Sequence, residues 1–359
     1  MLRTGDVAIR DGVVDAVGLP PAPGGAIAAP GLVDLQVNGF SGIDLMGADE
    51  QAVQAVGRAL VRHGVTSYLP TIITADAGRT ERALSTLRRA VDTPDAAGAR
   101  PLGVHLEGPF LSARRLGTHP PMHRRDPDPV LLQRWLEAGP VVAVTLAPEL
   151  PGALNLVTRL TGDGILVSVG HSDATAAQAH AAFDAGARTV THLFNAMSPL
   201  NHRAAGIPGV ALSRDDVVVQ LLVDGHHLAR DVVRMVWRAA AGRVVLVTDA
   251  TAAAGLAQES GNGRYALGDV DLELRDGAVR NADGQLAGSA ATLDAALREA
   301  HAIGIPLDAA LVAVTEAPAA LVRRRDIGRL LPGAPGDVVV LDDALVVRAT
   351  YREGAEVWS

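Results

Sequence analysis

Five ionisable residues stand at or just after the ends of short apolar runs: Glu107, His171, His192, His227 and Asp249. One carboxylate and two imidazoles are a typical ligand set for zinc or a similar ion in a hydrolytic enzyme, with a further position left open to water. A second carboxylate beside such an ion can take a proton from the attacking water and pass it to a leaving nitrogen. We therefore expect Glu107, His171 and His192 to hold a divalent metal ion and Asp249 to act as the base.

A purely structural role is the alternative for each of these residues. A lone buried histidine or glutamate is most often a hydrogen-bonded structural residue. The proposed site has four such residues, each after a separate apolar run: Glu107, His171, His192 and Asp249. Together they would leave several buried polar groups uncompensated unless they shared a ligand. As a group they indicate one common site.

The apolar runs predict eight β-strands, at residues 31–37, 66–73, 102–107, 141–147, 164–170, 188–193, 217–223 and 244–249. Amphipathic segments between most of them predict helices, such as 50–62, 78–91, 129–138, 174–185 and 229–240. This alternation is typical of repeated βα units and predicts an α/β fold, a (β/α)8 barrel of the TIM type over residues 31–314. The C-terminal ends of such strands open on one face, where residues far apart in sequence converge.

The two ends of the chain have a different pattern. Residues 6–18 and 327–358 contain short strands broken by Asp-Gly, Pro-Gly and Glu-Gly turns. We expect residues 1–30 and 315–359 to meet in one small β domain beside the barrel. A further strand pair within 264–282 could form a flap over the site.

Residue usage excludes several kinds of chemistry. The chain has no cysteine, and its 32 basic residues are all arginine. Thiolate catalysis, disulfides and iron–sulfur clusters are therefore excluded, as are Schiff bases and a carbamylated lysine between two metals. A reducing compartment is consistent with this usage.

Charge and hydropathy indicate the class of partner. The formal net charge of -8, without a basic run of five or more residues, argues against nucleic acid. A small phosphorylated substrate is still compatible, because a few arginines, histidines and backbone amides can bind phosphate. The opening residues resemble no signal peptide and no apolar run approaches 18 residues, so we expect a cytoplasmic protein with no membrane partner.

Several strings of the sequence resemble the N-acetylglucosamine-6-phosphate deacetylase family of the amidohydrolase superfamily. The strings are PGLVDLQVNG (30–39), GVTSYLPTIIT (64–74), GVHLEGPFL (103–111), VTLAPE (144–149), VGHSDAT (169–175), THLFNAM (191–197), VDGHH (223–227), LVTDATAAAG (246–255) and LAGS (286–289). The resemblance implies the same metal ligands and the same base as the strand ends do. It also implies that His119 contacts the amide carbonyl of the substrate and helps to polarise it.

The resemblance further implies how the substrate is held. It assigns phosphate binding to the backbone at Asn195 and Ala196, to His227, and to an arginine that the neighbouring subunit of a homodimer supplies. Arg203 is the best match for that arginine, although Ala204-Ala205-Gly206 follows it where relatives usually have Glu-Pro-Gly. Further substrate contacts are expected from Leu286, Ala287 and Gly288.

One departure from the superfamily concerns the first strand. Many amidohydrolases have His-x-His there as two more metal ligands, whereas this chain has Gln36-Val37-Asn38. Amides are poor substitutes for imidazole, so we expect one divalent ion per subunit, zinc or alternatively iron, cobalt or manganese. Gln36 and Asn38 could contact the water of that ion or could pack structurally. The N-terminal portion is also short, with 29 residues before Pro30.

These expectations combine into one predicted reaction, the hydrolysis of the acetamide of N-acetylglucosamine 6-phosphate to glucosamine 6-phosphate and acetate. Water activated by the metal and Asp249 would attack the carbonyl. Alternatives are the same reaction on the galactosamine epimer, a mononuclear deaminase of the amidohydrolase type, and a catalytically silent relative. The motif THLFNAM and the presence of all four site residues favour the deacetylase.

Overall fold

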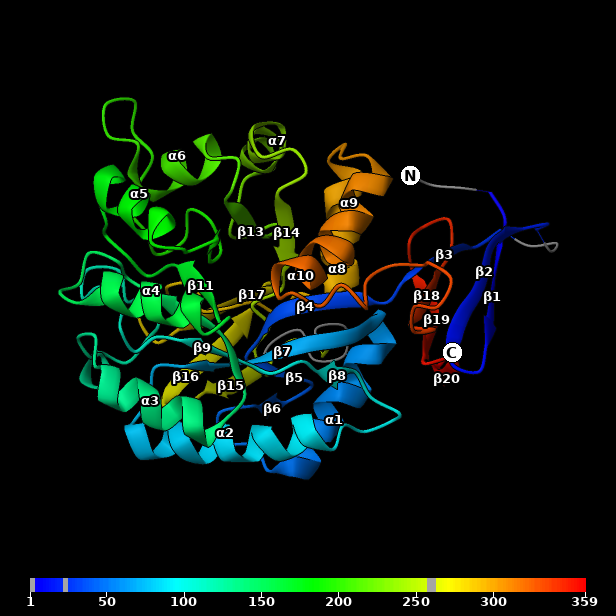
Figure 1. Ribbon diagram of the computed structural model, residues 1–359, viewed down its shortest axis with the longest axis horizontal. Helices are drawn as coiled ribbons and strands as arrows, with labels where there is room; N and C mark the ends of the chain where they lie inside the picture. Colours follow the sequence, from blue (N-terminus) through cyan, green and yellow to red (C-terminus); the bar gives the residue numbers. More distant parts are fainter. Residues whose placement is uncertain (1–3, 22–24, 257–262) are drawn as a thin grey trace.

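A barrel of eight parallel strands forms the centre of the computed structural model, which describes residues 4–21, 25–256 and 263–359 (Figure 1). Each strand pairs with its neighbour along the chain. The strands are β4 (Leu32–Val37), β7 (Val65–Ile73), β9 (Val104–Glu107), β10 (Val141–Leu146), β11 (Leu166–Val169), β12 (Thr189–Val190), β13 (Val218–Leu222) and β14 (Val244–Val247). The short β8 (Arg100–Pro101) pairs with β7 beside this ring. The predicted (β/α)8 barrel is confirmed, with every predicted strand present.

The barrel closes where β14 meets β4. In the described part of the chain this seam has one isolated parallel bridge, between Val37 and Ala250, in place of a continuous ladder. Side chains reinforce it, because the Thr248 hydroxyl donates to Asp34 Oδ2 at 2.6 Å. The seam thus brings the end of the first barrel strand beside the segment that carries Asp249.

Helices cover the outside of the barrel. They are α1 (Glu50–Leu60), α2 (Ala77–Asp92), α3 (Pro129–Ala138), α4 (Ala153–Gly162), α5 (Ala176–Asp184), α6 (Gly206–Ser213), α7 (Arg230–Ala239), α8 (Leu293–Ala302), α9 (Leu307–Val314) and α10 (Glu316–Leu321), with 3-10 turns η1 (Val61–His63) and η2 (Pro121–His123). Several begin at a side-chain cap that accepts otherwise unpaired N–H groups: Asp49, Asp76, Asp128 and Thr175. In the described part of the chain, none of the helices has the length and hydropathy needed to cross a membrane.

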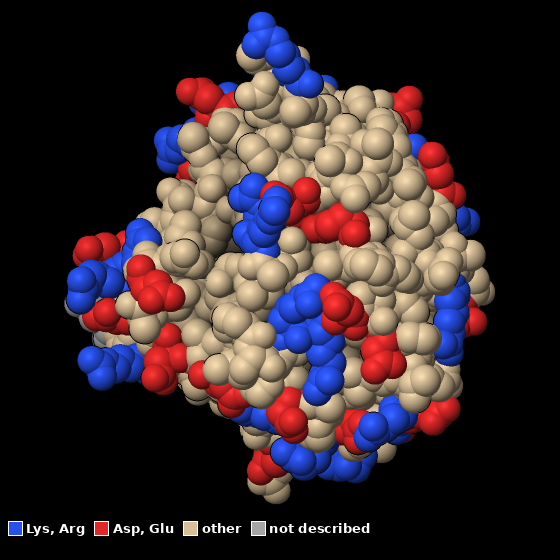
Figure 2. Space-filling view, turned by 90° about the vertical axis from the view of Figure 1, so that its left-hand side faces the viewer, with Lys and Arg blue, Asp and Glu red and all other residues tan. Residues whose placement is uncertain are grey.

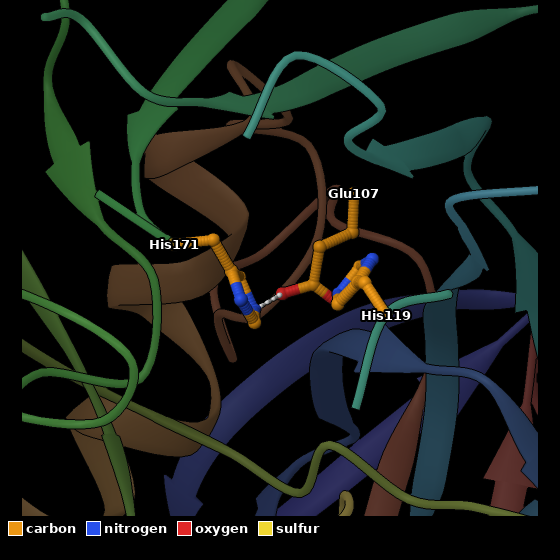
Figure 3. Close-up of side chains that lie close together, drawn as sticks. All are labelled: Glu107, His119 and His171. Atoms are coloured by element: carbon orange, nitrogen blue, oxygen red, sulfur yellow. Dashed lines mark ion pairs between the residues drawn. The ribbon is translucent and has the colours of Figure 1, made fainter. Parts of the chain in front are cut away.

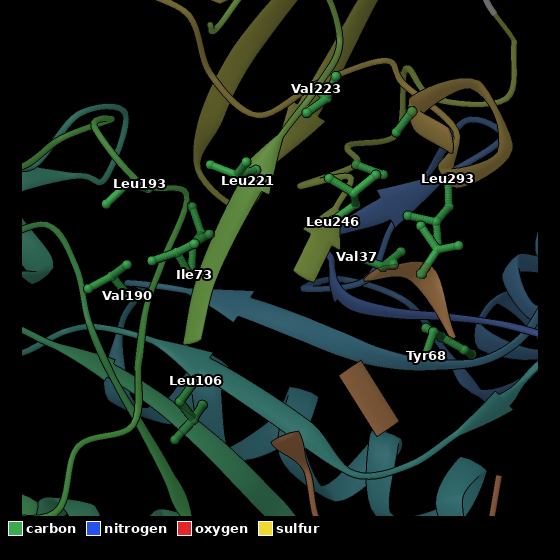
Figure 4. Packing of buried hydrophobic residues seen from close by; sticks show 14 of the residues in the cluster. Val37, Tyr68, Ile73, Leu106, Val190, Leu193, Leu221, Val223, Leu246 and Leu293 are labelled. Atoms are coloured by element: carbon green, nitrogen blue, oxygen red, sulfur yellow. The ribbon is translucent and has the colours of Figure 1, made fainter. Parts of the chain in front are cut away.

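Aliphatic side chains make up most of the core, as the 3% aromatic content predicts. One large cluster joins the strands to the covering helices, and Figure 4 shows side chains that belong to it on several strands, including Val37, Leu106 and Leu221. Each fully buried valine or leucine contributes about 1.5–3 kcal/mol. The C-terminal strand ends are therefore mounted on a rigid, closely packed support.

Both ends of the chain meet in a small β domain beside the barrel, on the right in Figure 1. Its sheet runs β20 (Ala355–Trp358), β19 (Val347–Arg352), β18 (Val338–Leu341) and β3 (Ile27–Pro30). The hairpin β1 (Asp6–Arg10) and β2 (Val13–Leu19) is connected to the C-terminal region by a bridge from Val13 to Pro335. The prediction that the termini share a β domain is confirmed.

A small antiparallel sheet follows the eighth barrel strand, with one strand more than the predicted pair. It consists of β15 (Gly263–Leu267), β16 (Val270–Arg275) and β17 (Ala278–Asn281). Polar contacts hold its first turn against neighbouring segments. Gly268 donates its N–H to Asp44 Oδ2 at 3.1 Å, and Asp269 forms ion pairs with Arg79 and His123. Asp44 ends the short hairpin of β5 (Gly39–Phe40) and β6 (Ile43–Asp44). The turn of the three-stranded sheet is thus held close to the end of β7.

Candidate active site

A pocket of about 290 Å³ contains most of the predicted site residues. Among its lining residues are Asn38, Glu107, His119, His171, His192, Asn195, Ala196, His227, Asp249, Leu286, Ala287 and Gly288. Two larger hollows, of about 570 Å³ each, contain none of them. Figure 2 shows a hollow on the face of the molecule toward which β4 runs, with basic and acidic side chains side by side at its edge.

Two predicted site residues lie outside the lining of this pocket. Gln36 is buried beside it and donates hydrogen bonds to Glu107 and Asp249. Arg203 is exposed in the loop before α6, where its own N–H is donated to Asn201 Oδ1 at 3.1 Å. The structure therefore gathers all the predicted residues except Arg203 at one place.

Three donor atoms converge at the bottom of the pocket. Glu107 Oε1 lies 3.2 Å from Nε2 of both His171 and His192, and the two ring nitrogens are 3.1 Å apart. All three side chains are buried, and Glu107 is the last residue of β9. His171 and His192 follow β11 and β12 with φ of 48° and 33°, a conformation that residues other than glycine seldom adopt. Such strained turns are common where a functional side chain must point inward.

His119 is close to the same group, and Glu107, His119 and His171 together could also hold a metal ion. Figure 3 shows these three side chains facing one another. His119 Nε2, however, lies 3.9 Å from Glu107 Oε2. Ligand atoms around a tetrahedral zinc ion are about 3.3 Å apart, given bonds of about 2.0–2.1 Å. The set of Glu107, His171 and His192 matches that spacing better.

The hydrogen bonds of His119 suit a different task. The N–H of Thr74 donates to His119 Nδ1 at 3.3 Å, so the ring proton belongs on Nε2. Burial, and next the charge of the nearby His171, lower the pKa of His119 to about 3. His119 is consequently a neutral donor with its N–H directed into the pocket.

The pKa values of Glu107 and His192 depend strongly on the interactions between the side chains of the site. Burial alone would raise the pKa of Glu107, but hydrogen bonds from His171 and His192 outweigh burial and keep this pKa well below its usual range. Burial would lower the pKa of His192, but the hydrogen bond and charge of Glu107 raise it overall. Glu107 is thus an anionic anchor for any cation bound here.

The pKa of Asp249 is raised, whereas the pKa of Glu107 is lowered. Burial, and next the negative charge of Glu107, raise its pKa to about 7, against the lowering effects of His192 and Asn38. A group with a pKa near the working pH can both accept and return a proton. Asp249 follows β14 with a φ of 49°, and its Oδ1 accepts hydrogen bonds from Gln36 and Asn38.

Sequence reasoning missed the residues that orient His171. The carbonyl of Arg115 is 3.0 Å from His171 Nδ1, and the Arg115 side chain donates to Asp173 at 2.8 Å. Glu149 accepts from the Ser172 hydroxyl at 2.7 Å. Metal-binding histidines usually have such a partner on the second ring nitrogen. Glu149 and Asp173 lie in the strings VTLAPE and VGHSDAT, the only signal that could have pointed to them.

His227 and the turn at Asn195 and Ala196 also line the pocket. His227 Nδ1 is 2.7 Å from Asp224 Oδ2, which fixes the ring. Asn195 donates its N–H to the carbonyl of His192 at 2.9 Å, and Ala196 has a φ of 49°. These groups therefore share the pocket with the three donor atoms.

The chain is similar to known proteins over most of its length. The family model described as the Amidohydrolase family matches residues 27–357. The N-acetylglucosamine-6-phosphate deacetylase of Bos taurus is 40% identical over 351 residues, which cover 93% of this chain and 84% of the relative. The N-acetylgalactosamine-6-phosphate deacetylase of Escherichia coli O157:H7 is 33% identical, with 96% of this chain and 93% of the relative covered.

A solved structure is similar over nearly the whole length. It is an alanine variant of the N-acetyl-D-glucosamine-6-phosphate deacetylase of Mycobacterium smegmatis in complex with N-acetyl-D-glucosamine-6-phosphate. Its TM-score is 0.90 at 36% sequence identity, with 98% of this chain and 94% of that chain covered.

Proposed function

Because the chain belongs to the N-acetylglucosamine-6-phosphate deacetylase family of amidohydrolases, we propose that it hydrolyses the acetamide of N-acetylglucosamine 6-phosphate to glucosamine 6-phosphate and acetate. One observation carries the proposal: the buried Asp249, with its pKa raised to about 7, shares a pocket with the converging donor atoms of Glu107, His171 and His192. A base and a cation site side by side are what amide hydrolysis needs.

The donor set fits one divalent metal ion. One carboxylate oxygen and two ring nitrogens, 3.1–3.2 Å apart and buried, have the chemistry and spacing of such a site. We propose Glu107, His171 and His192 as the ligands, with zinc as the metal and iron, cobalt or manganese as alternatives that the same set accepts. When bound, such an ion polarises a carbonyl and lowers the pKa of water. The amides of Gln36 and Asn38 support a stoichiometry of one ion.

Asp249 then moves one proton through the reaction. It accepts the proton of the water whose oxygen bonds to the carbonyl carbon, and it returns that proton to the nitrogen as the carbon–nitrogen bond breaks. His119, neutral and with its N–H directed into the pocket, donates to the carbonyl oxygen as negative charge develops there. A single donor of this kind contributes about 10²- to 10³-fold to turnover.

The phosphate would bind in the same pocket. We propose the turn at Asn195 and Ala196 together with His227 as its site, and Leu286, Ala287 and Gly288 as a wall beside the sugar. Arg203 would reach the pocket of a second copy in a homodimer, which its exposed position outside its own pocket supports. Binding of the phosphate would hold the amide in line with the attacking water.

The galactosamine epimer is the second candidate substrate, because the Escherichia coli relative that carries this name is 33% identical over nearly all of the chain. The direct test is acetate release from N-acetylglucosamine 6-phosphate, N-acetylgalactosamine 6-phosphate and unphosphorylated N-acetylglucosamine, with bound metal quantified in the same sample. We expect release from the first at the highest kcat/KM. Absence of release from both phosphates by metal-loaded protein would refute the proposal. A cytoplasmic location is part of it, consistent with the absence of cysteine.

A further inference from the structure

The two oxygens of Asp249 have different surroundings. Oδ1 accepts hydrogen bonds from Asn38 Nδ2 at 2.8 Å and from Gln36 Nε2 at 3.0 Å. No residue in the described part of the chain donates a hydrogen bond to Oδ2. This oxygen faces Gly288, where an added Cβ would lie 3.7 Å from it. Asp249 is thus fixed through one oxygen, and the other remains free on the side of the pocket wall.

The carboxylates determine how both amides are oriented. Gln36 Nε2 bridges two acids, since it also donates to Glu107 Oε1 at 3.1 Å. The reverse orientation would place an amide oxygen against carboxylate oxygens, which is repulsive. Within the described residues, Gln36 Oε1 and Asn38 Oδ1 have no protein partner that could impose an orientation. The bonds to the carboxylates, which are of the stronger, charge-assisted kind, therefore fix these side chains.

The backbone holds the amide donors of Gln36 and Asn38 opposite their acceptor, Asp249. Gln36 and Asn38 are two positions apart at the end of β4, so their side chains share a face. The N–H of Asn38 donates to the carbonyl of Ala250 at 2.8 Å. Ala250 directly follows Asp249, so this bond couples the backbone of the donor to that of the acceptor across the barrel seam.

From this arrangement we infer that Asn38 and Gln36 are positioning residues for the proposed reaction: they hold Oδ1 of Asp249 so that Oδ2 alone exchanges the proton with the attacking water and the leaving nitrogen. The inference rests on the proposed function. The amides stand at the end of the first strand, where many amidohydrolases have two imidazoles. The side-chain NH2 groups of Gln36 and Asn38 hold these two acids in place through three hydrogen bonds, without adding a net charge.

A role limited to closing the barrel seam is the competing explanation, and the variant Asn38→Leu separates the two. Leucine has the same branched shape at Cγ but no N–H to donate. We expect kcat to fall about 10- to 100-fold, because misplacement of a reacting group by about 1 Å costs up to 10²-fold. KM and the amount of bound metal per chain should stay within about 2-fold of the values for the original protein. The reason is that the substitution changes neither the proposed metal ligands nor the proposed phosphate site.

Gln220→Leu is the matched control. Gln220 is equally buried in the neighbouring part of the barrel and donates to Thr189 Oγ1 at 3.2 Å, away from Asp249. We expect it to lower the thermal midpoint about as much as Asn38→Leu does while leaving kcat nearly unchanged. If Asn38→Leu does not fold, Asn38→Ala is used with the same control.

A double-mutant cycle with Asp249→Asn gives the decisive readout. If Asn38 acts through Asp249, adding Asn38→Leu to Asp249→Asn should not slow the residual rate further. Equal fold-losses in both backgrounds, an unchanged kcat in the single variant, or a loss of bound metal would overturn the inference. Inactivity of the unaltered protein on every sugar phosphate would instead refute the proposed function.

Discussion

The buried carboxyl of Asp34 should make the free energy of unfolding depend on pH in a way that one substitution removes. Asp34 lies at the seam between β4 and β14, fully buried, and accepts from the Thr248 hydroxyl at 2.6 Å. Burial raises the pKa of this carboxyl from 3.8 to about 7, although hydrogen bonds from Thr248 and Gln36 act in the opposite direction. The substitution Asp34→Asn keeps the shape and an acceptor for Thr248 but removes the titration.

The sign follows from which state holds the proton. Up to about pH 7 the folded protein keeps the Asp34 carboxyl neutral, whereas the unfolded chain releases this proton near its ordinary pKa of 3.8. The stability present below pH 4 is therefore lost as the pH rises toward 7. Three pKa units at 1.36 kcal/mol each give a loss of about 4 kcal/mol in all, of which roughly 2–3 kcal/mol falls between pH 5 and pH 8.

Urea unfolding of both proteins at pH 5 and pH 8 tests this expectation. The free energy of unfolding of Asp34→Asn, relative to the original protein, should increase by about 2–3 kcal/mol between the two pH values. Asp271→Asn, at an exposed position on β16, is the control and should show no such increase. A pH-independent difference for Asp34→Asn would show that the Asp34 carboxyl is ionised in the folded protein throughout this range.

Further predictions concern catalysis. Asp249→Asn should keep its bound metal and lose several orders of magnitude in kcat; near-normal turnover would exclude Asp249 as the base. His119→Ala should lower kcat about 10²- to 10³-fold with little change in KM, and a change confined to KM would contradict its role as a donor to the carbonyl oxygen. His227→Ala should lower kcat/KM for the phosphorylated sugar and leave the low activity on N-acetylglucosamine unchanged, which parallel steady-state assays would show. Gly288→Ala should destabilise the fold by about 2 kcal/mol and reduce activity. The reason is that the φ of Gly288 is 58° and that an added Cβ would lie 2.6 Å from Thr251 Cγ2. A melting curve that matches the curve of the original protein would be evidence against this crowding.

Most of the fold follows from patterns that are local in the sequence. Apolar, β-branched runs alternate with amphipathic helices, and this alternation is enough to predict a parallel barrel and its open C-terminal face. Strand ends were less accurate: β12 covers two residues where six were predicted, 188–193. The reason is the turn at His192, whose φ of 33° ends the extended conformation so that the ring can point inward.

Contacts between side chains of distant strands could not be predicted in the same way. The sequence left open whether Gln36 and Asn38 pack structurally or approach the water of the ion. Their bonds to Asp249 depend on how β4 and β14 are placed at the seam, which no local pattern encodes. The support of His171 by Arg115 and Asp173 likewise joins two loops that are distant in sequence.

The strand ends and the family resemblance predicted the same ligand set, and the observed spacing of the donor atoms is consistent with it. His119 makes a second set possible, because it too is buried and lies near Glu107. Bound metal per chain, measured in His192→Ala and His119→Ala beside the original protein, separates the two sets most directly. We expect His192→Ala to lose the ion and His119→Ala to keep it; an ion retained by His192→Ala and lost from His119→Ala would contradict the site formed by Glu107, His171 and His192.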